Sequence, residues 1–394
     1  MRRSWYELDS LLGMRCFISD TPGIGGRLRA RVEDFVVRER FEACNDGEGE
    51  YLHFIMEKYN WDTIRAILEL SRRLGISSRR FGYAGTKDKR ACTVQRVSVR
   101  GVSEEQLRKL SIPGIRLHSF TRCRRGVSLG ELLGNEFEIV IREVADDSTG
   151  EVISRTSEQL EALGVPNYFG YQRFGTVRPN THIVGRAIVR GDLEEAVACY
   201  IGRPYPRERQ DAIEARRVYD ETRDPEEALR HFPERLQYER LMLRWLCRHP
   251  SDYAGALRRL PKKLRKLLVH AYQGYLFNMV LSRIIEDGME IKGRSIPIFG
   301  YRSELSEGRQ GEIEAEVLEE EGVELQDFWC SSMPELAQKG GRRCASISTR
   351  MSWKLEEDEL NPGMVKVTVR FFLPPGSYAT SVLREYMKAD PLSY

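Results

Sequence analysis

The sequence predicts an α+β fold in which a mixed, largely antiparallel sheet is interrupted by an inserted region. Strands expected at residues 35–37, 51–58 and 137–141 alternate with helices, but without the regular βαβ rhythm of a parallel sheet. Residues 193–288 are highly charged, broken by prolines and mainly helical in pattern. A strand expected at residues 365–371 comes late enough to return to the sheet begun earlier. The region between would then be an insertion.

The composition is that of a globular protein with two or three domains. The chain has 394 residues, 41% hydrophobic and 31% charged, with a formal net charge of only +3. Overall charge therefore does not indicate a nucleic-acid partner, and local basic clusters must carry that argument. No leader or membrane span is expected, and the eight scattered cysteines form no C-x-x-C pair. We expect a cytoplasmic protein with reduced thiols and no metal site.

A helix is predicted from Asp62 or Thr63, either of which can cap it, to about Leu74. Gly75 is expected to end this helix. The expected apolar stripe of this helix consists of Ile64, Ile67, Leu68 and Leu74. In the strand before it, one face should carry Leu52, Phe54 and Met56.

The stretch from Gly82 to Gln95 holds the candidate catalytic group. Asp88 lies among three cations, Lys87, Lys89 and Arg90, in a loop expected just before a strand. Neighbouring cations favour the charged form of a carboxylate, which suits a nucleophile or base close to a polyanion. An ordinary polar turn is the alternative, because Asp and Gly are common in turns. A P-loop is excluded, since neither Ser nor Thr follows Lys87.

An aromatic-rich stretch at residues 165–175 is a candidate base-binding segment. It combines four rings with the amide of Asn167 and the guanidinium of Arg173. A base that has left its stack needs a ring to pack on and polar groups for its edge. The alternative is an aromatic core turn, and we expect at least one ring to be core. The rings are Tyr168, Phe169, Tyr171 and Phe174.

The middle of the chain contains the densest basic cluster, at residues 258–266, a candidate phosphate-contact surface. Residues 270–285 should form a buried helix. His270 is expected to be structural, since no second His or Cys stands at metal-ligand spacing. Residues 289–343 are expected to form short strands and acidic loops.

Several stretches together carry a family resemblance. They occur in family order and are Glu33-Asp-Phe-Val-Val, Ala84-Gly-Thr-Lys-Asp-Lys-Arg-Ala, Leu133-Gly-Asn-Glu-Phe, Val165-Pro-Asn-Tyr-Phe-Gly-Tyr-Gln-Arg-Phe-Gly and Phe372-Leu-Pro-Pro-Gly-Ser-Tyr-Ala-Thr-Ser-Val-Leu-Arg-Glu. With these motifs the chain resembles the TruD family of tRNA pseudouridine synthases, although roughly residues 192–343 match weakly.

The resemblance implies a pseudouridine-synthase catalytic domain at residues 1–191 and 344–394. An α+β TRUD domain would be inserted at residues 192–343. It also implies a reaction that needs neither cofactor nor metal, in which uridine is detached, rotated and rejoined through C5. The implied partner is tRNA, with uridine-13 (tRNA numbering) as the target and no membrane involved. No motif addresses the oligomeric state, and we expect a monomer.

The resemblance assigns the catalytic aspartate to Asp88. It assigns the ring that packs against the target base to Phe169, and the asparagine near the aspartate to Asn167. The other substrate-binding residues expected are Arg29, Glu33, Phe35 and Lys87. Arg29 stands where bacterial members carry lysine, so the charge is kept but the geometry is not.

Two other functions are open to the sequence. A different RNA-modifying enzyme, such as a methyltransferase, is disfavoured because no strand followed by a glycine-rich cofactor loop is visible. A non-catalytic RNA-binding or tRNA-folding protein would depend little on Asp88. The sequence also leaves open whether Asp88 attacks C6 of the base, attacks C1′ of the ribose or removes a 2′ proton.

Overall fold

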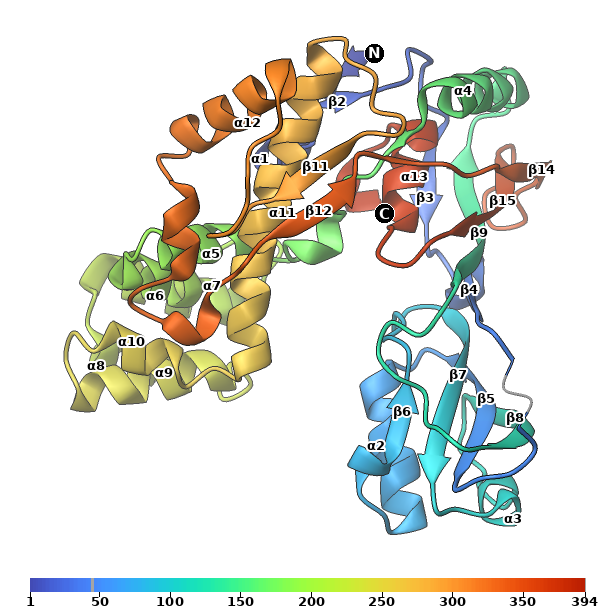
Figure 1. The fold of residues 1–394 in the computed structure, drawn as a ribbon, viewed down its shortest axis with the longest axis horizontal. Helices are drawn as coiled ribbons and strands as arrows, with labels where there is room; N and C mark the ends of the chain where they lie inside the picture. Colours follow the sequence, from blue (N-terminus) through green and yellow to red (C-terminus); the bar gives the residue numbers. More distant parts are fainter. Residues whose placement is uncertain (44–45, 394) are drawn as a thin grey trace. The chain divides into compact units, whose positions relative to one another are not determined.

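The computed structural model describes residues 1–43 and 46–393, which divide into two compact units (Figure 1). The sheet unit comprises Ser19–Val165 and Ile347–Tyr394, and the helical unit comprises Met1–Ile18 and Pro166–Ser346. The chain leaves the sheet unit at β10 (Val165–Pro166) and returns at β13 (Ser346–Ile347). Residues 166–191 thus lie in one unit with residues 192–343. The domain boundaries implied by the resemblance stay a prediction.

The sheet unit is built on a nine-stranded sheet, which confirms the predicted fold class. Its main path runs β14 (Ser352–Glu357), β15 (Val365–Leu373), β9 (Gly134–Val144), β4 (Phe35–Arg40), β7 (Cys92–Arg100), β5 (Tyr51–Tyr59) and β8 (Ile115–Cys123). Two short strands lie off this path, β3 (Gly25–Leu28) beside β9 and β6 (Phe81–Tyr83) beside β7. Within this sheet only the β4–β7 pair is parallel. The late strand β15 pairs antiparallel with β9, so the chain returns to the sheet near its C-terminal end, as predicted.

Among the described residues of the sheet unit, four α-helices are present: α2 (Thr63–Leu74), α3 (Glu104–Arg108), α4 (Thr149–Leu163) and α13 (Ala379–Met387). Helix α2 begins as predicted, with the Asp62 carboxylate accepting the Arg65 N–H, and ends at Gly75 in the left-handed region, φ 66°.

The predicted apolar stripe of α2 is wrong in part. Ile64 and Leu68 are 53% and 52% exposed, whereas Ala66, Ile67 and Leu70 pack on the sheet. The buried face also carries polar Thr63, whose hydroxyl donates to Oε1 of Gln95 on β7. Apolar residues alone could not reveal that tertiary bond. The strand residues in this core are Leu52, Phe54, Met56, Phe81, Val97 and Val99.

The helical unit is organised around α11 (Lys262–Glu286), which confirms the buried helix expected at residues 270–285. Its other elements are β1 (Arg2–Arg3), α1 (Glu7–Leu11), β2 (Cys16–Phe17), α5 (Thr181–Val189), α6 (Leu193–Ile201), α7 (Gln210–Thr222), α8 (Pro225–His231), α9 (Gln237–Arg248), α10 (Tyr253–Leu257), β11 (Ser295–Ile298), α12 (Gly308–Glu320) and β12 (Gly341–Cys344). Helix α12 lies where acidic loops were expected. Although α12 is rich in glutamate, it has an apolar stripe of Ile313, Val317 and Leu318, which is buried.

The basic cluster at residues 258–266 is partly neutralised inside the helical unit. Arg258 and Arg265 both pair with Glu335, at 2.9 and 2.6 Å. The guanidinium of Arg259 lies 4.1 Å from the ring centroid of Trp245. Part of this cluster therefore stabilises the unit.

Among the seven cysteines that the structure describes, one differs from the expectation, and Cys44 lies outside the described residues. Cys16, Cys92, Cys199, Cys247, Cys330 and Cys344 are free thiols. Cys123 is disulfide-bonded, so the prediction of reduced thiols is wrong for this residue. Scattered cysteines give no sequence signal of which of them the fold brings into bonding distance.

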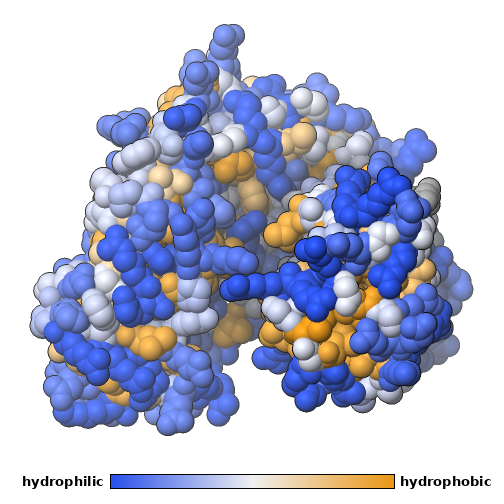
Figure 2. Space-filling view, turned by 60° about the horizontal axis from the view of Figure 1, so that its bottom comes forward, coloured by the Kyte–Doolittle hydropathy of each residue, from blue (hydrophilic) through white to orange (hydrophobic). Residues whose placement is uncertain are grey.

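The surface drawn in Figure 2 is mostly hydrophilic, with hydrophobic residues gathered in small patches. Within the described part of the chain, no helix has the length and apolar character needed to cross a membrane.

Candidate active site

Asp88 lies in the loop between β6 and β7, as the sequence predicts. Its side chain is 51% exposed, and Oδ2 accepts a hydrogen bond from Nη2 of Arg29 at 2.7 Å. The site thus presents a carboxylate to solvent with one guanidinium fixing one of its oxygens.

Arg29 connects two other predicted site residues, Phe35 and Asp88. Its guanidinium lies 4.2 Å from the ring centroid of Phe35, so Phe35 supports the cation that pairs with Asp88. The backbone of Arg29 is left-handed, with φ 58°, an uncommon conformation for a residue with a side chain. Arg90 donates to the Arg29 carbonyl at 2.8 Å. Arg29, Phe35, Asp88 and Arg90 therefore form one connected group.

A buried lysine that sequence reasoning missed holds the backbone of the loop. Nζ of Lys58 donates to the carbonyl oxygens of Trp61, Lys87 and Asp88, at 2.6, 3.3 and 3.0 Å. Burial lowers the pKa of Lys58 to about 8, opposed by the negative charges of Asp88 and Asp62. Because Lys58 lies on rigid β5, it fixes the loop at the position of the candidate catalytic residue.

Lys87 is tied down by a second buried group. Its Nζ lies 2.6 Å from Oε2 of Glu39 on β4, and the two side chains are 7% and 0% exposed. The backbone N–H of Lys87 donates to the Thr63 hydroxyl. The other oxygen of Glu39 accepts the backbone N–H of Arg96 on β7. Lys87 thus links the loop to the sheet through one carboxylate.

Glu33 lies on the exposed surface, where Oε1 accepts the hydroxyl of Tyr59 at 2.9 Å. A backbone hydrogen bond, followed by the bond from Tyr59, lowers the pKa of Glu33. Glu33 and Lys58 line an open groove of about 600 Å³ that crosses β4, β7 and β5. Among the described residues, no hydrogen bond or ion pair joins Glu33 to Asp88.

Asn167 and Phe169 belong to the helical unit, where α11 and β12 fix them. The Asn167 side chain donates to the Cys344 carbonyl at 2.9 Å and accepts from Nη2 of Arg343 at 2.5 Å. The backbone N–H and carbonyl of Phe169 both bond the side-chain amide of Asn278, at 2.8 and 3.1 Å. The segment is therefore clamped on both sides.

Phe169 differs from the other three rings of its stretch. Tyr168, Tyr171 and Phe174 are buried, so the core interpretation holds for them. Phe169 is half-buried, with its edge toward Phe277 at 5.4 Å and the Arg343 guanidinium 4.3 Å from its centroid. It also lines a cavity of about 550 Å³. It is thus the ring of this stretch with an open side.

Comparison with known proteins identifies the family. A family model described as "tRNA pseudouridine synthase D (TruD)" matches residues 11–295 and 292–386. The chain is 40% identical over 432 aligned residues to a probable tRNA pseudouridine synthase D of Methanococcoides burtonii, covering 98% of each. It is 43% identical to a protein of the same description from Methanopyrus kandleri, covering 90% of this chain and 89% of that one.

The chain belongs to the TruD family.

The fold agrees with a solved member of the TruD family. The crystal structure of a putative tRNA pseudouridine synthase D (TruD) from Methanosarcina mazei matches with a TM-score of 0.86 at 38% identity, covering 98% of both chains. Within the described residues, no group of three or more His, Cys, Asp or Glu side chains is arranged to hold a metal ion.

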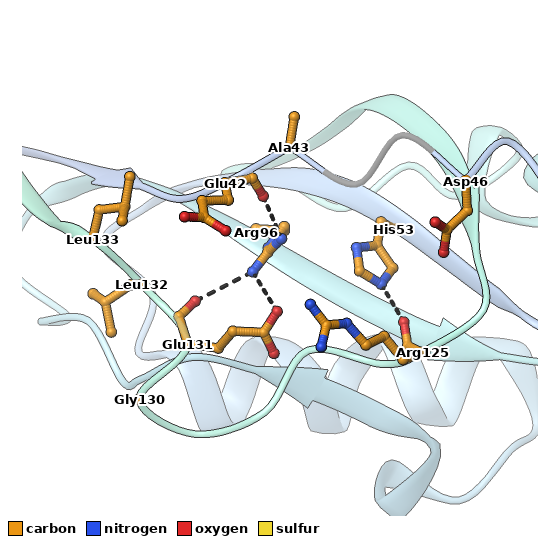
Figure 3. Close-up of a pocket in the computed structure, with 10 residues that line it drawn as sticks. All are labelled: Glu42, Ala43, Asp46, His53, Arg96, Arg125, Gly130, Glu131, Leu132 and Leu133. Atoms are coloured by element: carbon orange, nitrogen blue, oxygen red, sulfur yellow. Dashed lines mark hydrogen bonds and ion pairs between the residues drawn. The ribbon is translucent and has the colours of Figure 1, made fainter.

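A second cavity in the sheet unit, of about 330 Å³, contains none of the seven predicted site residues (Figure 3). Arg96 crosses it, donating to the carbonyls of Glu42 and Glu131 and to the Glu131 carboxylate, while His53 donates to the Arg125 carbonyl. The backbone N–H of Arg96 also donates to Glu39, the carboxylate that pairs with Lys87. Arg96 therefore connects this cavity to the loop that carries Asp88.

Two of the residues that sequence analysis missed in this TruD-family site, Lys58 and Glu39, could have been found from the pattern of their strands. Lys58 continues the alternation of Leu52, Phe54 and Met56, and Glu39 continues that of Phe35 and Val37. A charged residue in phase with core positions indicates a buried polar contact. Arg343 had no such signal, because it lies 176 residues from Asn167 in sequence.

Proposed function

We propose that the protein is a tRNA pseudouridine synthase that isomerises uridine-13 of tRNA, with Asp88 as nucleophile or base. The observation that carries the proposal is the half-exposed Asp88 carboxylate on a loop fixed by Lys58, in a chain that matches the TruD family along most of its length. An aspartate carboxylate can form a covalent intermediate as a nucleophile or accept a proton as a base.

The chemistry balances without a redox partner or cofactor. The bond between N1 and C1′ breaks, the uracil rotates and a bond forms between C5 and C1′. The hydrogen on C5 is lost to a base and N1 ends with a proton, so substrate and product are isomers. In our proposal Asp88 either attacks the nucleotide and is later displaced, or removes the first proton. Arg29 orients its carboxylate.

The other site residues have supporting roles in the proposal. The half-buried Phe169 ring packs against the extruded uracil, and Asn167 is held by Arg343 in position for a polar contact. Phe35 supports Arg29, while Glu33 shapes the adjoining groove. Lys87 acts through its bond to Glu39, which fixes the loop carrying Asp88. Action on tRNA also supports a cytoplasmic location and requires no membrane.

We predict that Phe169→Ala lowers kcat/KM roughly 5- to 150-fold, the equivalent of about 1–3 kcal/mol of base stacking. Phe169→Tyr keeps the ring face and should stay within about threefold of the wild type. Initial rates on one unmodified tRNA transcript measure both variants. Equal losses in the two would mean that the ring only fills space between α11 and its neighbours.

The target position is tested with two transcripts that differ at one nucleotide. Pseudouridine, mapped by carbodiimide modification and primer extension, should form at position 13 of the natural sequence. It should not form when that uridine is replaced by cytidine. A replaced transcript that gains pseudouridine elsewhere would overturn the assignment of the position, but not of the reaction.

A further inference from the structure

The cavity beside Phe169 lies entirely within the helical unit. Its walls are Phe169 and Arg173 of the aromatic stretch, His270 and Gln273 of α11, Ile298 of β11, and residues 337–342, which lead into β12. The inserted region therefore forms much of the surface next to the ring that we propose packs on the target base.

The charge of these walls favours an anion. No Asp or Glu lines the cavity. Across the described part of the chain, neither Arg173 nor Lys339 forms an ion pair with a carboxylate. Arg258 and Arg265 of the same unit, in contrast, share the carboxylate of Glu335. Arg342 also lines the cavity, but its guanidinium donates to Ser295 and Ser306. Arg173 and Lys339 are thus the two cations of this wall that are available to an anion.

Arg173 is also positioned beside the ring. Its guanidinium lies 5.4 Å from the centroid of Phe169, and its Nε is buried without a hydrogen-bond partner. A buried donor without a partner is costly, so a ligand acceptor would stabilise it. Lys339 is exposed at the rim of the same cavity. A phosphate is an acceptor suited to both groups.

Acceptors for a base edge lie on the α11 wall. The Nε2–H of His270 donates to Oε1 of Gln338 at 3.1 Å, which leaves Nδ1 as an acceptor. The amide nitrogen of Gln273 donates to the Phe299 carbonyl at 2.5 Å, which leaves Oε1 uncommitted by that bond. Uracil carries an N–H donor that such acceptors can satisfy.

We propose that this cavity binds the nucleotide whose base packs on Phe169, with its phosphate between Arg173 and Lys339. The inference rests on the proposed function. It adds that residues 337–342 of the inserted region contact the RNA next to the reacting base, and that Arg173 and Lys339 contribute substrate affinity.

The test compares Lys339→Gln and Arg173→Gln with Lys292→Gln, which removes the same charge from an exposed lysine outside the cavity. Kd for one unmodified tRNA transcript is measured on the full chain over a range of salt concentrations, with KM and kcat on the same RNA. Each cavity variant should raise Kd and KM roughly threefold or more and reduce the slope of log Kd against log salt by about 0.7–0.9. Lys292→Gln should match the wild type in both quantities.

Wild-type Kd, KM and salt slope in both cavity variants would overturn the inference while leaving the proposed function intact. Failure of the wild type to isomerise a tRNA that it binds would instead contradict the proposed function. Because the Lys339 side chain is exposed, its variant should fold even if Arg173→Gln does not, and thermal unfolding of each variant checks this. An equal change in Lys292→Gln would assign the effect to overall charge and overturn the inference.

Discussion

Replacing Asp88 by asparagine should reduce isomerisation roughly 10³-fold or more, because the amide can neither act as a carboxylate nucleophile nor accept a proton at neutral pH. Asparagine has the same shape, and the substitution leaves in place both the Lys58 bonds to backbone carbonyls of the loop and the bond between Lys87 and Glu39. Removing a negative charge near phosphates should, if anything, tighten tRNA binding.

Single-turnover rates and Kd on the same transcript measure the two effects separately. Asp146→Asn is the matched control, since Asp146 is exposed in the sheet unit outside the candidate site. It should leave both quantities unchanged. Parallel loss of binding and isomerisation in Asp88→Asn would indicate a structural loop. Retention of activity would favour the non-catalytic role for this aspartate.

Glu39→Gln should be strongly destabilising, because it leaves the buried Lys87 ammonium without its counter-charge. Breaking a buried ion pair by removing one partner costs about 3–5 kcal/mol of the free energy of unfolding. Here the loss should also reduce activity, since the same carboxylate holds Lys87 and the backbone of Arg96. Glu104→Gln, which breaks the exposed pair with Arg108, should cost no more than about 1 kcal/mol.

Denaturant unfolding of each variant provides the measurement. The double variant Glu39→Leu with Lys87→Met distinguishes the two possible roles of Lys87. Apolar residues of similar size can replace a buried pair at little cost, so stability should largely return. Recovery of tRNA affinity together with stability would support an anchoring role. Recovered stability with weakened tRNA binding would mean that Lys87 itself contacts RNA and would contradict our assignment.

The sequence predicted the elements whose signals are local. The cap of α2 at Asp62, its stop at Gly75, and the loop position of Asp88 before β7 depend only on neighbouring residues. The return of β15 to the sheet could also be predicted, because its alternating apolar residues require a partner strand.

The rest depends on contacts between distant segments. Ile64 and Leu68 are apolar yet exposed, whereas Thr63, the first residue of α2, is polar yet buried and bonds Gln95 of β7. Arg343 fixes Asn167 from 176 residues away, and Asn278 fixes Phe169 from 109 residues away. Periodicity within a segment contains no information about such pairs. The half-buried state of Phe169 likewise follows from its packing on α11.

Whether this chain isomerises uridine without any added group is decided by one assay. Unmodified tRNA transcript is incubated with the wild type in buffer containing EDTA, and pseudouridine is mapped by carbodiimide modification and primer extension. We predict a single stop at uridine-13 with the wild type and none with Asp88→Asn. No stop with the wild type, despite tight tRNA binding, would contradict the proposed reaction and leave an RNA-binding protein.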